Sequence, residues 1–167
     1  MESVIIGNIC SLFAMLTDSL SSSRKTAKGV LVFQTISQVF YVTGSIILKG
    51  YSAAVQNALS VLRNLAAIKE IDSKVIEWAL VIGGVVLGML FNNLGAIGWV
   101  PIIANFEYSL AVFRFKDNER ALKMAFFVAV AMYSVFNFAI YNFVGCISNV
   151  IVAVTTFIFL VKGNKKD

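Results

Sequence analysis

Long, continuously apolar segments constrain the fold of this chain more than any other feature of its sequence. A helix needs about 20 apolar residues to cross the ~30 Å hydrocarbon core of a bilayer. Of the 167 residues, 59% are hydrophobic and only 14% are charged, whereas soluble domains carry about 25% charge. The segments lack the alternation of a membrane β-barrel, so they predict helices embedded in a lipid bilayer. Seven are predicted, over residues 4–20, 29–47, 52–68, 75–92, 95–113, 121–140 and 143–161.

The absence of histidine excludes several kinds of chemistry. Without it, the usual transition-metal sites and histidine-based catalytic triads cannot be built. The chain also has no dense acidic cluster and no phosphate-binding GxxxxGK[ST] loop. We therefore expect no enzyme activity, no metal and no cofactor, and transport driven by ATP would require a partner protein.

Basic residues divide unequally between the two ends of the predicted helices. Thirteen of the 14 lysines and arginines fall on one side, and only Lys49 falls on the other. Since basic residues favour the cytoplasmic side, we expect the amino end outside and the carboxyl end in the cytoplasm. The net charge of +5 is then a topological feature and does not predict nucleic-acid binding. The thirteen are Arg24, Lys25, Lys28, Arg63, Lys69, Lys74, Arg114, Lys116, Arg120, Lys123, Lys162, Lys165 and Lys166.

Short motifs recur in order along the two halves of the chain, which indicates an internal repeat. Three predicted helices, one spacer helix and three more would give two parallel bundles related by an axis along the membrane normal. The corresponding domains are residues 1–70, a linker helix over 71–93, and 94–167 with a short basic tail. The recurring motifs are Ile6-Gly7 and Ile97-Gly98, Lys25 with Lys28 and Arg120 with Lys123, Gln38-Val39-Phe40-Tyr41 and Ser134-Val135-Phe136-Asn137, and Gln56-Asn57 and Ser148-Asn149.

The predicted spacer helix carries two glycines four residues apart, Gly84 and Gly88. This spacing is typical of close helix contacts, including contacts between two copies of a membrane protein, so a homo-oligomer is one possible state. Alternatively, glycine is simply common in membrane helices.

Polar side chains at membrane depth are costly, which makes them candidates for function. Amides both donate and accept hydrogen bonds, so we expect Asn57 and Asn149 to contact a substrate in a central cavity. Alternatively, such side chains hold the helices together through hydrogen bonds between them. The residues expected to line the rest of the cavity are Gln38, Tyr41, Ser134 and Asn137.

Three charged residues and one proline are candidates for gating or ion coupling. Arg63 is predicted to pair with Asp18 or Glu107 at an inner gate; alternatively, all three side chains extend to the membrane interface. Pro101 is the only proline, and it predicts a kink in the fifth helix that is either flexible or static.

Two stretches resemble the YgjV-type bacterial inner-membrane proteins: residues 50–63 (GYSAAVQNALSVLR), and Trp99-Val100-Pro101-Ile102-Ile103-Ala104 leading into Leu110-Ala111-Val112-Phe113-Arg114. More distantly, the pattern of three, one and three helices is similar to the SWEET sugar facilitators and the PnuC-type vitamin-precursor transporters. In SWEETs a third-helix asparagine from each half faces the substrate, and Asn57 and Asn149 hold the matching positions. SWEETs also have a proline in the first helix of each bundle, whereas this chain has one only in the second.

These features together predict a multi-pass protein of the bacterial inner membrane that transports a small polar metabolite by alternating access. The alternative is a non-transporting receptor, sensor or assembly protein, in which the polar side chains pack without a cavity.

Overall fold

The computed structural model describes residues 2–47, 51–92, 94–139 and 143–163, and their regular structure is entirely helical. Each of the seven predicted segments corresponds to one α-helix, with ends that differ by a few residues. In chain order the helices are α1 (Glu2–Ser22), α2 (Ala27–Ile47), α3 (Tyr51–Ile68), α4 (Lys74–Leu90), the 3₁₀ helix η1 (Gly95–Gly98), α5 (Trp99–Arg114), α6 (Glu119–Ala139) and α7 (Phe143–Gly163).

Five of these seven helical segments are long and apolar enough to cross a membrane, counted over the described residues. They comprise α1, α2, η1 with α5, α6 and α7. The remaining two helices do not meet this criterion, for separate reasons. Helix α4 has only 17 residues, and α3 contains an arginine and several amide and hydroxyl side chains. Helix α3, the most polar of the seven, must therefore be shielded from lipid by the other helices.

Side-chain caps start three helices at the same end of the bundle, and each cap follows a short connection. The hydroxyl of Thr26 accepts a hydrogen bond from the Gly29 amide at the start of α2. Ser73 and Asn118 do the same for the first turns of α4 and α6. Such caps satisfy amides that have no partner within the helix. The basic residues described above cluster around these connections, so we call this the basic end.

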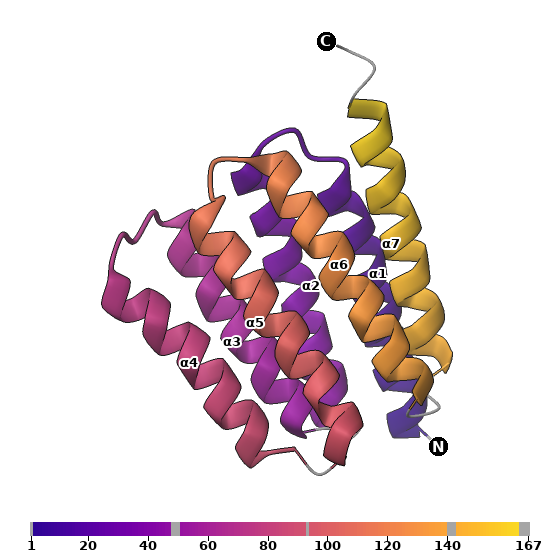
Figure 1. Ribbon diagram of the computed structural model, residues 1–167. Coiled ribbons are helices and arrows are strands. Elements are labelled where there is room, and N and C mark those ends of the chain that lie inside the picture. Colours follow the sequence, from indigo (N-terminus) through magenta and orange to yellow (C-terminus); the bar gives the residue numbers. More distant parts are fainter. Residues whose placement is uncertain (1, 48–50, 93, 140–142, 164–167) are drawn as a thin grey trace.

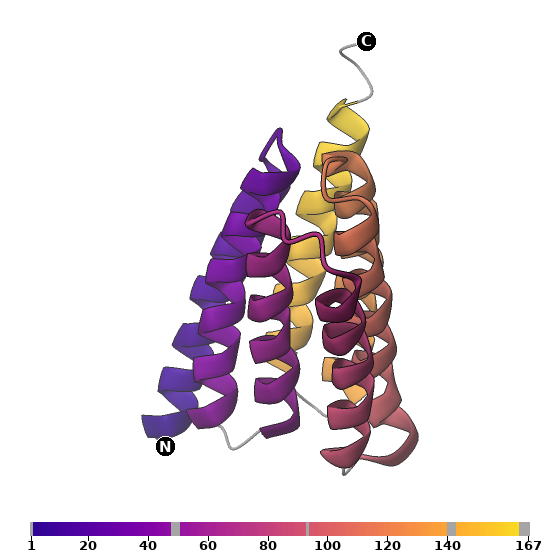
Figure 2. The ribbon, with the colours of Figure 1, turned by 90° about the vertical axis from the view of Figure 1, so that its left-hand side faces the viewer.

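The helices form two facing rows (Figure 1, Figure 2). In one row α2 lies between α1 and α3, and in the other α6 lies between α5 and α7. Across the rows, α1 contacts α7, α2 contacts α6, and α3 contacts α5, while α4 packs at one edge against α3 and α5. The interpretation of these rows as two parallel three-helix bundles joined by a linker helix stays a prediction.

Apolar side chains cover the outside of the bundle, and many polar side chains lie inside it. Exposed large apolar residues follow the outward faces of the helices, as with Leu12 and Leu16 on α1 and Val154 and Phe157 on α7. Exposed apolar surface on this scale is unfavourable in water, whereas lipid tails contact it without cost. The surface is thus suited to a bilayer.

Glycines on one face of α4 let this helix approach the two rows closely. Gly84 and Gly88 are buried, and their contacts are with α3 and α5 of the same chain. A Cβ atom at Gly88 would lie 2.5 Å from Gln56 Nε2 and 2.8 Å from Ile102 Cγ1. The two predicted glycines therefore serve a close contact within the chain.

Replacing Gly88 by alanine is expected to push α4 away from α3 and α5, which should lower the free energy of unfolding by about 1–3 kcal/mol. Thermal unfolding of the purified protein in detergent measures the effect. Gly83→Ala is the matched control on the same helix, because a Cβ there meets nothing within 4 Å. Equal melting temperatures for the two variants would contradict the proposed role of Gly88.

Candidate functional site

The arginine of α3 is the largest fully buried side chain among the described residues, with 2% of its surface exposed. Its guanidinium makes three hydrogen bonds, all to neutral side chains. Nε donates to Asn64 Oδ1 at 3.0 Å, and Nη1 donates to Asn105 Oδ1 at 2.9 Å and to Ser109 Oγ at 3.0 Å. Placing an arginine at the centre of a membrane helix costs about 3 kcal/mol, so these charge-assisted bonds are needed to offset that cost.

Asn105 of α5 connects the arginine to two further helices. Its Oδ1 also accepts a hydrogen bond from Ser60 Oγ at 3.0 Å, and its Nδ2 donates to Gln56 Oε1 at 2.6 Å. Gln56 Nε2 in turn donates to the carbonyl of Gly84 on α4 at 2.9 Å. One amide on α5 thus links α3 to α5 and, through Gln56, to α4.

Tyr108 completes the surroundings of the guanidinium. The Arg63 Cζ atom lies 4.7 Å from the centroid of the Tyr108 ring, a cation–π geometry that stabilises a desolvated cation. The tyrosine hydroxyl donates a hydrogen bond to Gln34 Oε1 on α2. We call this buried set the Arg63 network; its members are Gln34, Gln56, Ser60, Arg63, Asn64, Asn105, Tyr108 and Ser109.

A second, smaller polar cluster lies between α1 and its neighbours. The Asp18 carboxylate is buried and accepts a hydrogen bond from the Ser37 hydroxyl of α2. It also interacts with Tyr41 of the same helix. Nearby in the chain, the Ser22 hydroxyl is hydrogen-bonded to Thr156 of α7 at 2.6 Å. The inward faces of both rows therefore carry polar groups.

The structure does not bring together the two asparagines predicted to bind substrate. Asn57 on α3 is half-buried and Asn149 on α7 is almost fully buried. Their helices lie at opposite corners of the bundle, with α2 and α6 between them (Figure 1).

The other four predicted cavity residues are half-buried and lie on the two middle helices. On α2, Gln38 has a buried Oε1 atom without a hydrogen-bond partner, and Tyr41 faces Asp18. On α6, the Ser134 hydroxyl lies 3.4 Å from the Cys146 carbonyl of α7. Asn137, one turn further along α6, also has an interaction partner.

The predicted gate residues occupy different environments. Asp18 and Arg63 are buried inside the bundle. Glu107 is half-buried and interacts electrostatically with Arg63, yet one of its carboxylate oxygens is buried without a hydrogen-bond partner. Among the described residues, Arg63 forms no salt bridge with either carboxylate.

Pro101 lies in the first turn of α5, directly after the 3₁₀ helix η1. Amides in the first turn have no partner within the helix, so proline is tolerated there without breaking a helical hydrogen bond. The change from 3₁₀ to α-helix thus occurs at the start of α5, and the remainder of the helix is continuous.

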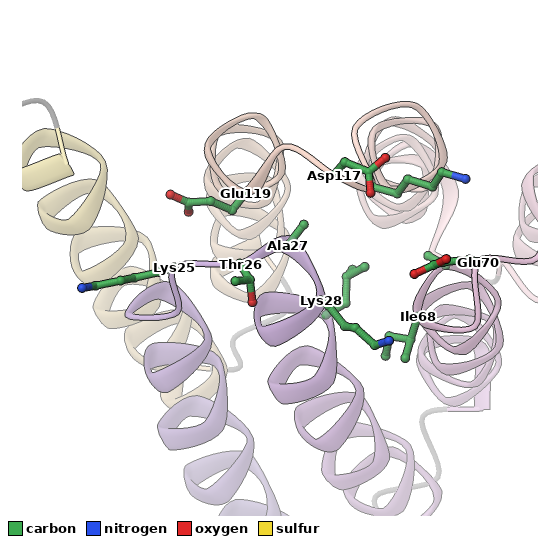
Figure 3. A pocket seen from close by; sticks show the side chains of 11 residues that line it. Lys25, Thr26, Ala27, Lys28, Ile68, Glu70, Asp117 and Glu119 are labelled. Carbon is green, nitrogen blue, oxygen red and sulfur yellow. The ribbon is translucent and has the colours of Figure 1, made fainter. Parts of the chain in front are cut away.

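A pocket of about 290 Å³ opens at the basic end, between the connections that precede α2 and α6 and the end of α3 (Figure 3). Lys28 extends from α2 toward Ile68 at the end of α3 and toward Glu70 just beyond it (Figure 3). The pocket carries charges of both signs, and its apolar lining includes the buried residues Leu31 and Ala67. The charged lining residues are Lys25, Lys28, Lys116, Glu70, Asp117 and Glu119.

Spacing along the helices would have identified most of the Arg63 network. Gln56, Ser60 and Arg63 are separated by four and three residues, which places them on one face of α3. Asn105 and Ser109 repeat this spacing on α5. What the sequence lacks is the pairing of these two faces, because nothing in either helix specifies its partner. Within the described ranges, no group of three or more acidic or cysteine residues is placed to hold a metal ion.

Fold and site together define a multi-pass helical membrane protein with a polar interior. The family model for Imp-YgjV, described as bacterial inner membrane protein, matches residues 5–167. The chain therefore belongs to this family of bacterial inner membrane proteins. No curated protein and no solved structure matches it.

Replacing Asn105 by alanine is expected to lower the free energy of unfolding by about 3 kcal/mol or more. The substitution leaves hydrogen-bonding groups of Gln56 and Ser60 buried without partners and removes one of the two acceptors of Arg63 Nη1, and each unpaired group costs about 1–3 kcal/mol. Thermal unfolding in detergent tests this. Thr43→Val is the control, because Thr43 is exposed and bonds only to its own helix. An Asn105→Ala protein as stable as the control variant would show that the network contributes little to stability.

Proposed function

We propose that this protein is a small transporter or facilitator that moves a polar metabolite across the bacterial inner membrane by alternating access. The Arg63 network carries the proposal. A buried cation held between the two rows of helices is expensive to maintain inside a membrane, and residues of this kind usually mark substrate or ion pathways. The proposal includes no catalytic activity and no cofactor.

The pattern of helix contacts supports a transporter built from two repeats. Exchanging α1 with α5, α2 with α6, and α3 with α7 converts each contact between these helices into another contact that is also present. This is the pattern expected of two three-helix units, residues 1–70 and 94–167, related by an axis along the membrane normal. The helix between them, α4, then acts as the linker. The resemblance to SWEET and PnuC transporters belongs to the same proposal.

Alternating access would be a rocking motion of one row against the other. The residues between the rows would line the substrate path, with Asn57 near the Arg63 network and Asn149 near the Asp18 cluster. Gln38, Tyr41, Ser134 and Asn137 would line the middle of the path, and Asp18, Arg63 and Glu107 would gate it or couple it to an ion. By the distribution of basic residues, the basic end would face the cytoplasm and the amino end the outside.

One observation favours a non-transporting receptor, sensor or assembly protein. Asn105 bonds to both Gln56 and Ser60, and Gln56 bonds to α4, as polar side chains do when they only hold helices together. A protein of this second kind would need no change in these bonds during its activity.

A ligand screen by thermal unfolding separates the two functions. A solute that binds the folded protein raises its melting temperature by mass action. We expect one class among sugars, nucleosides, vitamins, amino acids and organic acids to stabilise the native protein, and the Asn57→Ala, Asn149→Ala double variant to lose this response. Flux of the same solute into proteoliposomes then tests transport directly.

The control for this screen is Thr43→Val, which alters an exposed side chain outside the proposed path. A solute that stabilises the protein but does not cross proteoliposome membranes would favour the receptor or sensor. A screen without any stabilising solute, together with a fully stable double variant, would count against both asparagines as binding residues.

A further inference from the structure

We infer that the Arg63 network is a binding site for an oxyanion, namely a carboxylate or phosphate group on a small organic solute. The inference deepens the proposed function, on which it rests for the solute being transported. It starts from the charge of the site: the cation is fully buried, and all three of its hydrogen-bond acceptors are neutral amide or hydroxyl oxygens.

No carboxylate of the described chain neutralises Arg63. The salt bridges among the described residues join Lys74 to Glu77 and Lys123 to Glu119, both at the basic end. Asp18 instead accepts a hydrogen bond from Ser37, and Glu107 interacts with Arg63 only at longer range. Removing a charge from water is costly unless an opposite charge accompanies it, so a negative ligand would find an unmatched positive charge here.

Hydrogen-bond donors are also left over in the network. Gln34 and Asn64 are fully buried, and the Nε2 atom of the first and the Nδ2 atom of the second have no partner. The orientation of the Asn64 amide is fixed, because its oxygen accepts from a guanidinium, which can only donate. Surplus donors around a cation are what an oxyanion requires.

The pocket at the basic end adjoins the network along α2 and α3. Two of its buried lining residues, Leu31 and Ala67, lie one helical turn from network residues on the same helix faces. Leu31 precedes Gln34 by three residues on α2, and Ala67 follows Arg63 by four on α3. An anion in the pocket would reach the site by displacing these two apolar side chains.

Substituting Asn64 by aspartate tests the inference, because it places a carboxylate where Asn64 Oδ1 now lies, 3.0 Å from Arg63 Nε. This internal counter-ion would neutralise the positive charge of Arg63 that the ligand requires. We expect the Asn64→Asp protein to fold with an unchanged or higher melting temperature and to bind anions at least about tenfold more weakly. A network that is only structural would predict the same stability but no anion response in either protein.

The measurement is thermal unfolding of the full chain in detergent with succinate, lactate, inorganic phosphate and glycerol 3-phosphate. Succinamide, lactamide and glycerol serve as neutral analogues of the organic anions. Asn118→Asp is the matched control: it makes the same change of charge at the start of α6, where aspartate caps a helix as well as asparagine does. Stabilisation by the two carboxylates alone, or by the two phosphate compounds alone, identifies the group that is bound.

Stabilisation by anions that survives in Asn118→Asp and is lost in Asn64→Asp supports the inference. It is overturned if no anion stabilises the native protein, if the neutral analogues act equally, or if Asn64→Asp keeps the full response. Flux in proteoliposomes separates it from the proposed function. Transport of a neutral solute that Asn64→Asp leaves unchanged would support the transporter and reject the anion site. Anion binding without flux would support the anion site and reject the transporter.

Discussion

The rest of this structure depends on one buried charge, the Arg63 guanidinium, which is enclosed among helices in a lipid environment. Lipid offers no hydrogen bonds, so the donors of Arg63 can be satisfied only by other side chains. Asn64, Asn105 and Ser109 supply the acceptors, and the last two join α3 to α5 at the edge of the facing rows where α4 packs. Charge-assisted hydrogen bonds of this kind help to offset the cost of burying an arginine inside a membrane protein.

The lack of hydrogen-bonding partners in lipid also explains why α3, the most polar helix, is among the most enclosed. Helix α3 is covered by α2, α4 and α5, and the cover on one side depends on glycine. At Gly88 the backbone of α4 comes so close that even a methyl group would collide with Gln56 and Ile102. Gln56 therefore reaches the Gly84 carbonyl and joins α4 to the network. Small residues on one helix and amides on the next thus act together.

Helix positions were predictable from the sequence, since the apolar segments correspond to all seven helices. Asp18 and Arg63 were also found as charges within membrane segments, but their environments were not. An arginine side chain is long enough to extend to an interface, and only the packing shows that both charged groups lie inside the bundle. Asn57 and Asn149 match as a repeat in sequence, yet their helices occupy opposite corners of the bundle. A recurring motif specifies equivalent positions, which a symmetry axis can hold far apart.

The sequence by itself determined the membrane environment, the number of helices and the collection of basic residues at one end. These follow from local apolarity and charge, which the bilayer selects segment by segment. Only the tertiary structure decided that the polar faces of α3 and α5 meet, that Asn105 rather than Glu107 bonds to Arg63, and that donors of Gln34 and Asn64 remain free. The reason is physical: within lipid, all helix pairs bury similar apolar surface, so partner choice depends on close packing and hydrogen-bond geometry.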